Sequence, residues 1–230
     1  MDAGAFGNRL GLHEAYRFAR GEEVVSSNGT RAKLSRPLDW LVIADHSDNM
    51  GFFPDLLAAK PHILSDPMGK DWYDRIQAGE GVGVALEIIS KFSQGEFPET
   101  LMYTPDSAPY KSVWQDTIDA AEEYNDPGKF TALIGFEWTS LIKGNNMHRV
   151  VIYRDGADKA SQMVAYTTYP PMGSPDPRDL WSWLTSFEGN TGGDVLAIAH
   201  NGNLANGIMF RLSDQWNGRE FDDEYVTQRA

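Results

Sequence analysis

Residues 38–46 have the sequence LDWLVIADH, in which an apolar run leads directly into Asp45 and His46. Short, continuous apolar runs with β-branched residues predict buried strands. Four segments of the chain have this character: Leu38–Ala44, Thr131–Phe136, Val150–Tyr153 and Val195–Ala199. The chain therefore offers several strands for one buried sheet.

Helical patterns alternate with these strands. Apolar residues recur at helical spacing in residues 12–19, 114–121 and 180–187, and Asp176 followed by Pro177 predicts the start of the third helix, with Gly189 just after it. This alternation predicts an α/β fold with a mostly parallel sheet covered on both faces, either an open doubly wound sheet or a β/α barrel. We expect a single domain over residues 1–230. Residues 54–110 and 157–177 are long connections, expected to lie over the catalytic face, with helical segments at 71–77 and 84–92.

Composition excludes several classes of function. The formal charge is −13, from 33 acidic and 20 basic residues, and no basic cluster would attract nucleic-acid phosphates. The chain has no cysteine, which excludes disulfides and thiolate chemistry, so a metal ion would need His, Asp and Glu ligands. No apolar stretch is long enough for a membrane span and no signal peptide is evident. Both a cytoplasmic and a periplasmic location agree with these features.

Potential metal ligands stand at the ends of the predicted strands. His46, Glu137 and His200 follow three of them, and His148 lies just before the fourth. In parallel β/α folds the carboxyl ends of strands form the catalytic face. Three imidazoles and a carboxylate suit zinc, manganese or iron, and the two oxygens of Glu137 can bridge two ions. The sequence thus predicts a site for divalent metal ions.

Other polar residues near these positions have two interpretations each. Asp45 would bind or orient metal ligands, or take up a proton, but Asp is also favoured as a cap of a turn or helix. Arg149 would contact an anionic substrate, or pair with a surface carboxylate. Asn201 and Asn203 would donate hydrogen bonds to an anion, yet Asn-Gly is also an ordinary turn. Both alternatives stay open for each residue.

The motifs together resemble a known family. LDWLVIADHSDNMG, TALIGFEWTS, NNMHRVVIY and VLAIAHNGN, with eleven residues from Glu137 to His148, are similar to the PHP (polymerase and histidinol phosphatase) superfamily, and more narrowly to a bacterial branch catalogued only as a domain of unknown function. The resemblance extends from Met1 to about Phe210. It implies a distorted seven-stranded β/α barrel with two or three divalent metal ions that hydrolyses phosphoesters.

The resemblance also implies roles for individual residues. His46 matches the histidine of the second motif, Glu137 the bridging carboxylate, and His148 and His200 the ligands that complete the second metal. Asp2 matches the closing acid of a first motif of the form HxHTxxSxD. The HxH pair before Asp2 and a DxH motif after His200 are absent from the sequence. We therefore expect an incomplete barrel, truncated at both ends.

These observations predict a metal-dependent hydrolase, most simply a phosphoesterase, that activates water at a di- or trinuclear centre. Its substrate would be a small phosphoester or a related anionic ester. The alternative is a truncated or degenerate barrel module that binds metal weakly and is not catalytic on its own. Metal content distinguishes the two, since tightly held ions favour an enzyme.

Overall fold

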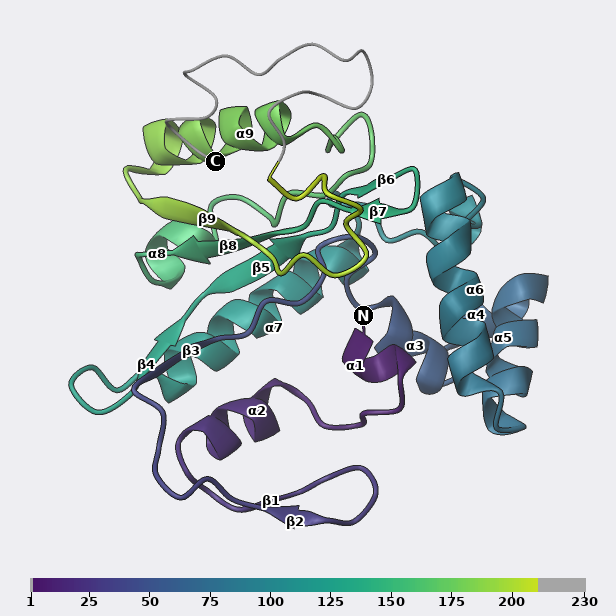
Figure 1. The fold of residues 1–230 in the computed structure, drawn as a ribbon, viewed down its shortest axis with the longest axis horizontal. Coiled ribbons are helices and arrows are strands. Elements are labelled where there is room, and N and C mark those ends of the chain that lie inside the picture. Colours follow the sequence, from purple (N-terminus) through teal and green to yellow (C-terminus); the bar gives the residue numbers. More distant parts are fainter. Residues whose placement is uncertain (1, 211–230) are drawn as a thin grey trace.

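The structure is a computed structural model that describes residues 2–210. It has a mixed α/β fold with a central group of strands (Figure 1). Two of these strands pair in parallel, and three others form an antiparallel sheet in the order β5-β8-β9. The parallel pair is β3 (Trp40–Val42) with β4 (Thr131–Leu133), and the three-stranded sheet contains β5 (Gly135–Trp138), β8 (Arg149–Tyr153) and β9 (Val195–Ala199). An isolated parallel bridge between His46 and Glu137 continues the line of β3 alongside β5.

The expected seven-stranded β/α barrel is wrong for the part of the chain that the structure describes. Its strands form separate sheets of two or three, and none of these sheets closes into a barrel. The two remaining sheets are small hairpins, β1 (Val24–Val25) with β2 (Arg31–Ala32) and β6 (Leu141–Ile142) with β7 (Asn145–Asn146).

The expectation of a mostly parallel sheet is also wrong. β8 runs antiparallel to both β5 and β9, and only β3 and β4 form a parallel pair among the described strands. The reason lies in the connection from β5 to β8. Residues 139–148 connect β5 to β8 and contain the β6–β7 hairpin, with Gly144 at φ 78, whereas a parallel pair needs a crossover of about a dozen residues or more.

The predicted helices are confirmed, with changed ends. α2 (Leu12–Ala19), α7 (Ala108–Tyr124) and α9 (Pro177–Thr191) cover the three predicted amphipathic segments. The side chain of Asp176 accepts a hydrogen bond from the Arg178 backbone N–H and caps α9 as predicted. However, α9 continues through Gly189 and ends before Gly192, which adopts the left-handed conformation at φ 67.

The excursion over residues 54–110 contains the two predicted helices. These are α5 (Pro67–Gln77) and α6 (Gly81–Gln94), and Figure 1 shows them beside the end of the sheet near β6 and β7. The shorter elements of the described chain are α1 (Asp2–Ala5), α3 (Phe52–Leu57), α4 (Pro61–Ser65), the 3-10 helix Glu99–Leu101 and α8 (Ala157–Ala160). No helix among residues 2–210 combines the length and the apolar character that crossing a membrane requires.

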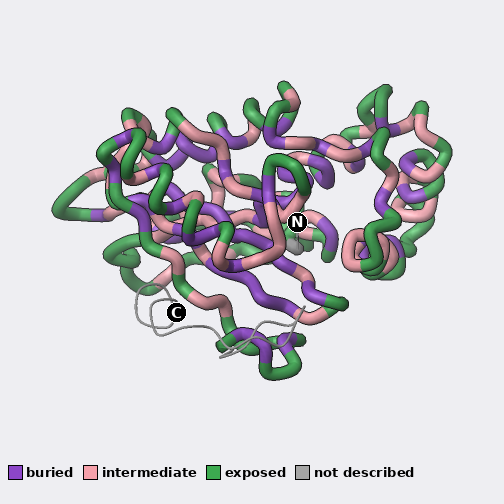
Figure 2. The backbone as a smooth tube through the Cα atoms, turned by 90° about the horizontal axis from the view of Figure 1, so that it is seen from above, coloured by how far each residue is buried: buried purple, intermediate pink, exposed green. Residues whose placement is uncertain are grey.

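One face of the three-stranded sheet packs against α7 and α9. Trp114 of α7 packs edge-on against Phe136, with ring centroids 5.9 Å apart, and Phe187 of α9 packs against Tyr153 at 5.0 Å. Buried segments lie at the centre of the molecule and exposed segments around it (Figure 2). On the opposite face of β9, Leu196 is 59% exposed and Ile198 45% exposed. The expectation that helices cover both faces is therefore wrong for β9.

Candidate metal centre

The four predicted metal ligands that the structure describes lie at one edge of the central strands. His46 follows β3, Glu137 lies near the end of β5, His148 immediately precedes β8 and His200 follows β9. Because β8 is antiparallel to β5 and β9, its start lies at the edge where those two strands end. The position of His148 before its strand, which looks irregular in the sequence, is what the antiparallel pairing requires.

The same four side chains also share one face of the sheet. His46 bridges to Glu137, Glu137 pairs with Val150, and His148 is two residues before Val150. The backbone N–H of His200 donates to the carbonyl of His148 at 3.1 Å, so these two residues lie opposite each other. Side chains two residues apart on a strand point to the same face, and paired residues share a face. The cluster is therefore set by strand register.

Glu137 lies at the centre of the cluster. Its Oε1 is 2.9 Å from His148 Nδ1 and 3.6 Å from His200 Nε2, and its Oε2 is 3.5 Å from His46 Nδ1. His46, Glu137 and His148 are all buried, and each offers one ligand atom within 4.8 Å of the others. This set of two imidazoles and a carboxylate, with a third imidazole at the rim, could hold a divalent metal ion.

The surroundings keep the Glu137 carboxylate ionised. Burial is the largest influence and raises the pKa of Glu137, but the hydrogen bond with His148 and the charges of His46, His148 and His200 together lower that pKa below its ordinary value. An ionised, buried carboxylate requires a cationic partner. The charges of the imidazoles, or a metal ion beside them, would satisfy this need.

Two imidazole nitrogens of the cluster are also available to bind an ion. His148 Nε2 and His200 Nδ1 are buried and have no hydrogen-bond partner among the described residues. A buried polar atom without a partner costs about 1–3 kcal/mol, so such atoms usually mark a site for water, an ion or a ligand. Imidazole nitrogens are good ligands for zinc, manganese and iron. The donor set therefore fits a divalent transition-metal ion.

Thr139 orients His46 and was missed by sequence reasoning. The Thr139 hydroxyl donates to the carbonyl of Glu137 at 2.8 Å, and its oxygen lies 2.8 Å from His46 Nδ1. Because the hydroxyl proton is already used, the oxygen accepts from the His46 Nδ1–H, which leaves the lone pair of the imidazole on Nε2. Thr139 stands two residues after Glu137, and side chains with this spacing on a strand share a face. This spacing was the signal in the sequence that could have placed Thr139 beside the metal ligands.

Asp48 is a second residue that sequence reasoning passed over. It is buried two residues after His46, and its two carboxylate oxygens accept hydrogen bonds from the Thr168 backbone N–H at 2.8 Å and from the Thr168 hydroxyl at 2.5 Å. Burial raises the pKa of Asp48 to about 6, although these hydrogen bonds and the charge of His46 oppose the rise. Asp48 thereby ties the loop around Thr168 to the segment that carries His46.

Arg149 and Asp45 lie on the opposite side of the strands from the cluster. The buried Arg149 guanidinium donates to the carbonyls of His148 at 3.0 Å and Met209 at 2.8 Å, and it lies 6.0 Å from the Trp181 ring. Asp45 directly precedes His46, so its side chain points to the opposite face of the strand. Burial is the main cause of the raised pKa of Tyr16, and the charge of Asp45 contributes to it. The structure does not bring these residues to the metal ligands, and their catalytic and substrate-binding roles stay predictions.

The remaining predicted residues lie at the periphery. Asn201 and Asn203 are exposed, and the Asn203 backbone N–H donates to Asn201 Oδ1 at 2.9 Å, which is the turn interpretation of this stretch. Anion binding by these residues stays a prediction. Asp2 lies in α1, and its side chain is outside the described part of the chain, so its predicted role as a metal ligand stays untested.

Comparison with known families gives a match over the whole chain. The family described as "Protein of unknown function (DUF3604)" matches residues 1–230. The chain belongs to the DUF3604 family. None of the curated proteins and none of the solved structures with which the chain was compared matches it. In this chain, the buried group of His46, Glu137 and His148 is thus a candidate metal site that rests on the geometry above.

Proposed function

We propose that this DUF3604 chain is a metal-dependent hydrolase of the phosphoesterase type that acts on a small anionic ester. The observation that carries the proposal is the Glu137 carboxylate, buried among the imidazoles of His46, His148 and His200. Buried His and Glu side chains at strand ends with unsatisfied nitrogen atoms are typical of catalytic metal sites. The order and spacing of the motifs, which resemble the PHP superfamily, support the same function.

We propose a centre with more than one ion, as the resemblance to the PHP superfamily implies. Glu137 Oε1 faces His148 and His200, whereas Oε2 faces His46. A carboxylate has two oxygens and could therefore help to hold more than one cation. We propose zinc, manganese or iron, because the donor set of nitrogen and carboxylate oxygen suits these ions.

The residues of the chain hold and orient this centre. Bound divalent ions would supply Lewis acidity, polarising the ester and lowering the pKa of water toward neutrality. Glu137 provides the negative charge that retains the ions, and Thr139 sets the orientation of the His46 ring. The burial of the three central ligands limits water around the site and strengthens its electrostatic interactions with an anionic ester.

A non-catalytic metal-binding module is the second candidate. It is favoured by the position of Arg149, whose guanidinium is engaged with the Met209 and His148 carbonyls on the face opposite the cluster. Without a contact from Arg149, the metal ions would have to stabilise the negative charge that develops on a transferred group. This candidate predicts metal binding without turnover.

Metal analysis combined with hydrolysis assays tests the proposal. The protein is loaded separately with zinc, manganese and iron(II), and metal content is measured by mass spectrometry together with hydrolysis of 4-nitrophenyl phosphate and 4-nitrophenyl sulfate. We expect bound metal and metal-dependent turnover, both lost in Glu137→Gln. Glu123→Gln, at a side chain that is 61% exposed, is the matched control and should change neither. Normal metal content and turnover in Glu137→Gln would overturn the assignment, and metal without turnover on any ester would favour the non-catalytic module.

A further inference from the structure

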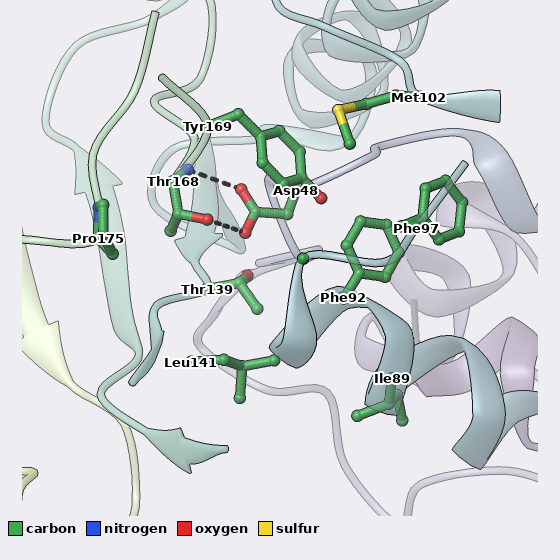
Figure 3. A pocket seen from close by; sticks show the side chains of 11 residues that line it. Asp48, Ile89, Phe92, Phe97, Met102, Thr139, Leu141, Thr168, Tyr169 and Pro175 are labelled. Atoms are coloured by element: carbon green, nitrogen blue, oxygen red, sulfur yellow. Dashed lines mark hydrogen bonds between the residues drawn. The ribbon is translucent and has the colours of Figure 1, made fainter. Parts of the chain in front are cut away.

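A pocket with apolar walls, whose lining Figure 3 shows, includes Thr139, the residue that contacts His46 of the candidate metal centre. Its volume is about 260 Å³. One wall comes from α6 and the segment that follows it, and the other comes from residues 139–141 after β5 and from the connection between α8 and α9. The side chains that the argument uses are Asp48, Ile89, Phe92, Thr139, Leu141 and Tyr169.

The pocket adjoins the metal cluster through two of its lining residues, which are neighbours of His46. Thr139 lines the pocket, and its hydroxyl oxygen lies 2.8 Å from His46 Nδ1. Asp48 also lines the pocket and stands two residues after His46. A molecule in the pocket would therefore lie next to the His46 side of the centre.

The walls of the pocket suit a flat, apolar group. Phe92 stacks on Phe97 with ring centroids 4.0 Å apart, and it lies parallel to Tyr169 at 6.0 Å. The charged side chain in the lining is Asp48, and Thr168 donates a hydrogen bond to each of its two oxygens (Figure 3). An apolar cavity of roughly 150 Å³ accommodates benzene. This larger pocket has room for a fused aromatic ring system.

We propose that this pocket binds the apolar, ring-sized part of the ester substrate while the anionic part is held at the metal centre. That the substrate is an ester rests on the proposed function. That it carries an apolar group rests on the pocket alone. It narrows the substrate class to esters of aromatic or similarly bulky apolar alcohols. Sugar and glycerol esters would leave the aromatic walls in contact with polar hydroxyl groups, which is unfavourable.

Two substitutions on the same helix separate this proposal from general effects on folding. Ile89 lines the pocket, and Ile89→Trp would fill it. Leu86 lies one helical turn earlier, is 57% exposed and does not line the pocket, so Leu86→Trp is the matched control. Thermal unfolding and metal content would show that both variants are folded with an intact metal centre.

The first measurement needs no metal and no turnover. Binding of 2-naphthol to metal-free protein is measured by calorimetry for the wild type and both variants. We expect one site per chain, at least 10-fold weaker binding in Ile89→Trp and unchanged binding in Leu86→Trp. Absence of binding in the wild type, or equal binding in all three proteins, would overturn the proposal.

The second measurement compares two esters whose alcohols have similar acidity. We expect KM for 2-naphthyl phosphate to be about 10-fold lower than for phenyl phosphate, because the second ring buries additional apolar area. Ile89→Trp should abolish this difference, and a difference that persists in Ile89→Trp would contradict the pocket assignment. Binding of 2-naphthol without hydrolysis of either ester would instead contradict the proposed function and leave the pocket assignment supported.

Discussion

His148 Nδ1 and Glu137 Oε1 lie 2.9 Å apart, and this contact joins the start of β8 to the end of β5 inside the protein. The side chains are only 7% and 9% exposed. The contact positions the His148 ring so that its second nitrogen, Nε2, is buried without a partner among the described residues. A buried nitrogen without a partner usually marks a site for water, an ion or a ligand, and a bound cation could satisfy it.

Replacement of His148 should remove metal binding. Mutation of a group that only orients a metal ligand typically lowers metal affinity about 10- to 100-fold. We expect His148→Ala, which removes a ligand itself, to lower metal affinity by more. Metal content after dialysis against a weak chelator measures the effect. His13→Ala is the control, since the His13 side chain is 55% exposed and belongs to no such cluster. Equal metal retention in both variants would exclude His148 as a ligand.

Thr139→Val should weaken metal binding without unfolding the protein. Valine keeps the size of threonine but removes the hydroxyl that orients His46. We expect metal affinity to fall about 10- to 100-fold, as for other groups that orient metal ligands, at a stability cost of about 1 kcal/mol. Competition with a fluorescent chelator measures the affinity. Thr139→Ser keeps the hydroxyl and should retain most of the affinity; if both variants lose it equally, the hydroxyl is not what matters.

Arg149→Lys should destabilise the fold while metal content stays normal. Lysine cannot reproduce the planar guanidinium that bonds the Met209 and His148 carbonyls. The expected loss in the free energy of unfolding is about 2 kcal/mol, measured by urea denaturation. A fall in kcat with unchanged stability would instead favour the predicted contact between Arg149 and substrate.

Asp66 should stabilise α5 above a threshold pH. Its carboxylate accepts from the Met68 and Gly69 backbone N–H groups, and the hydrogen bond from Thr100, the largest cause, lowers the pKa of Asp66. Because the folded pKa is below the unfolded one, the contribution is complete above the unfolded value of about 3.9 and disappears as pH falls through the folded value. Asp66→Ala should cost about 0.5–2 kcal/mol at pH 7 and less near pH 2.

The control for Asp66 is Asp116→Ala, an exposed change on α7. This change should alter the free energy of unfolding by less than about 0.5 kcal/mol. Thermal unfolding at pH 7 and pH 2 measures both variants. An Asp66→Ala effect that does not depend on pH would show that the carboxylate charge contributes nothing to the cap.

Gly135→Ala should disturb the contact between β3 and β5. An added Cβ would lie 2.5 Å from Val42 Cγ2 and 2.6 Å from the Val151 carbonyl oxygen, which is closer than atoms pack. We expect a loss of about 1–3 kcal/mol in the free energy of unfolding, from overpacking. Gly189→Ala is the control, because nothing lies within 4 Å of its added Cβ and alanine favours the helix. Comparable stability of the two variants would contradict the close approach.

The sequence by itself determined where the local elements lie and where the candidate ligands stand. Val195–Ala199 is a strand with the predicted bounds, and Asp176 caps α9 as predicted. These features depend on short-range physics, since apolar runs, helical periodicity and capping side chains act over a few residues. The same local pattern placed His46, Glu137 and His200 at strand ends.

Only the tertiary structure decided the direction of the strands and the faces of their side chains. The short β6–β7 hairpin turns β8 antiparallel, which brings His148 to the cluster and excludes the parallel arrangement predicted for these strands. Strand alternation then separates Arg149 from its neighbour His148. Pairing partners and the pocket beside Thr139 are set by contacts between residues far apart in the chain, and such long-range contacts leave no periodic signal in the sequence.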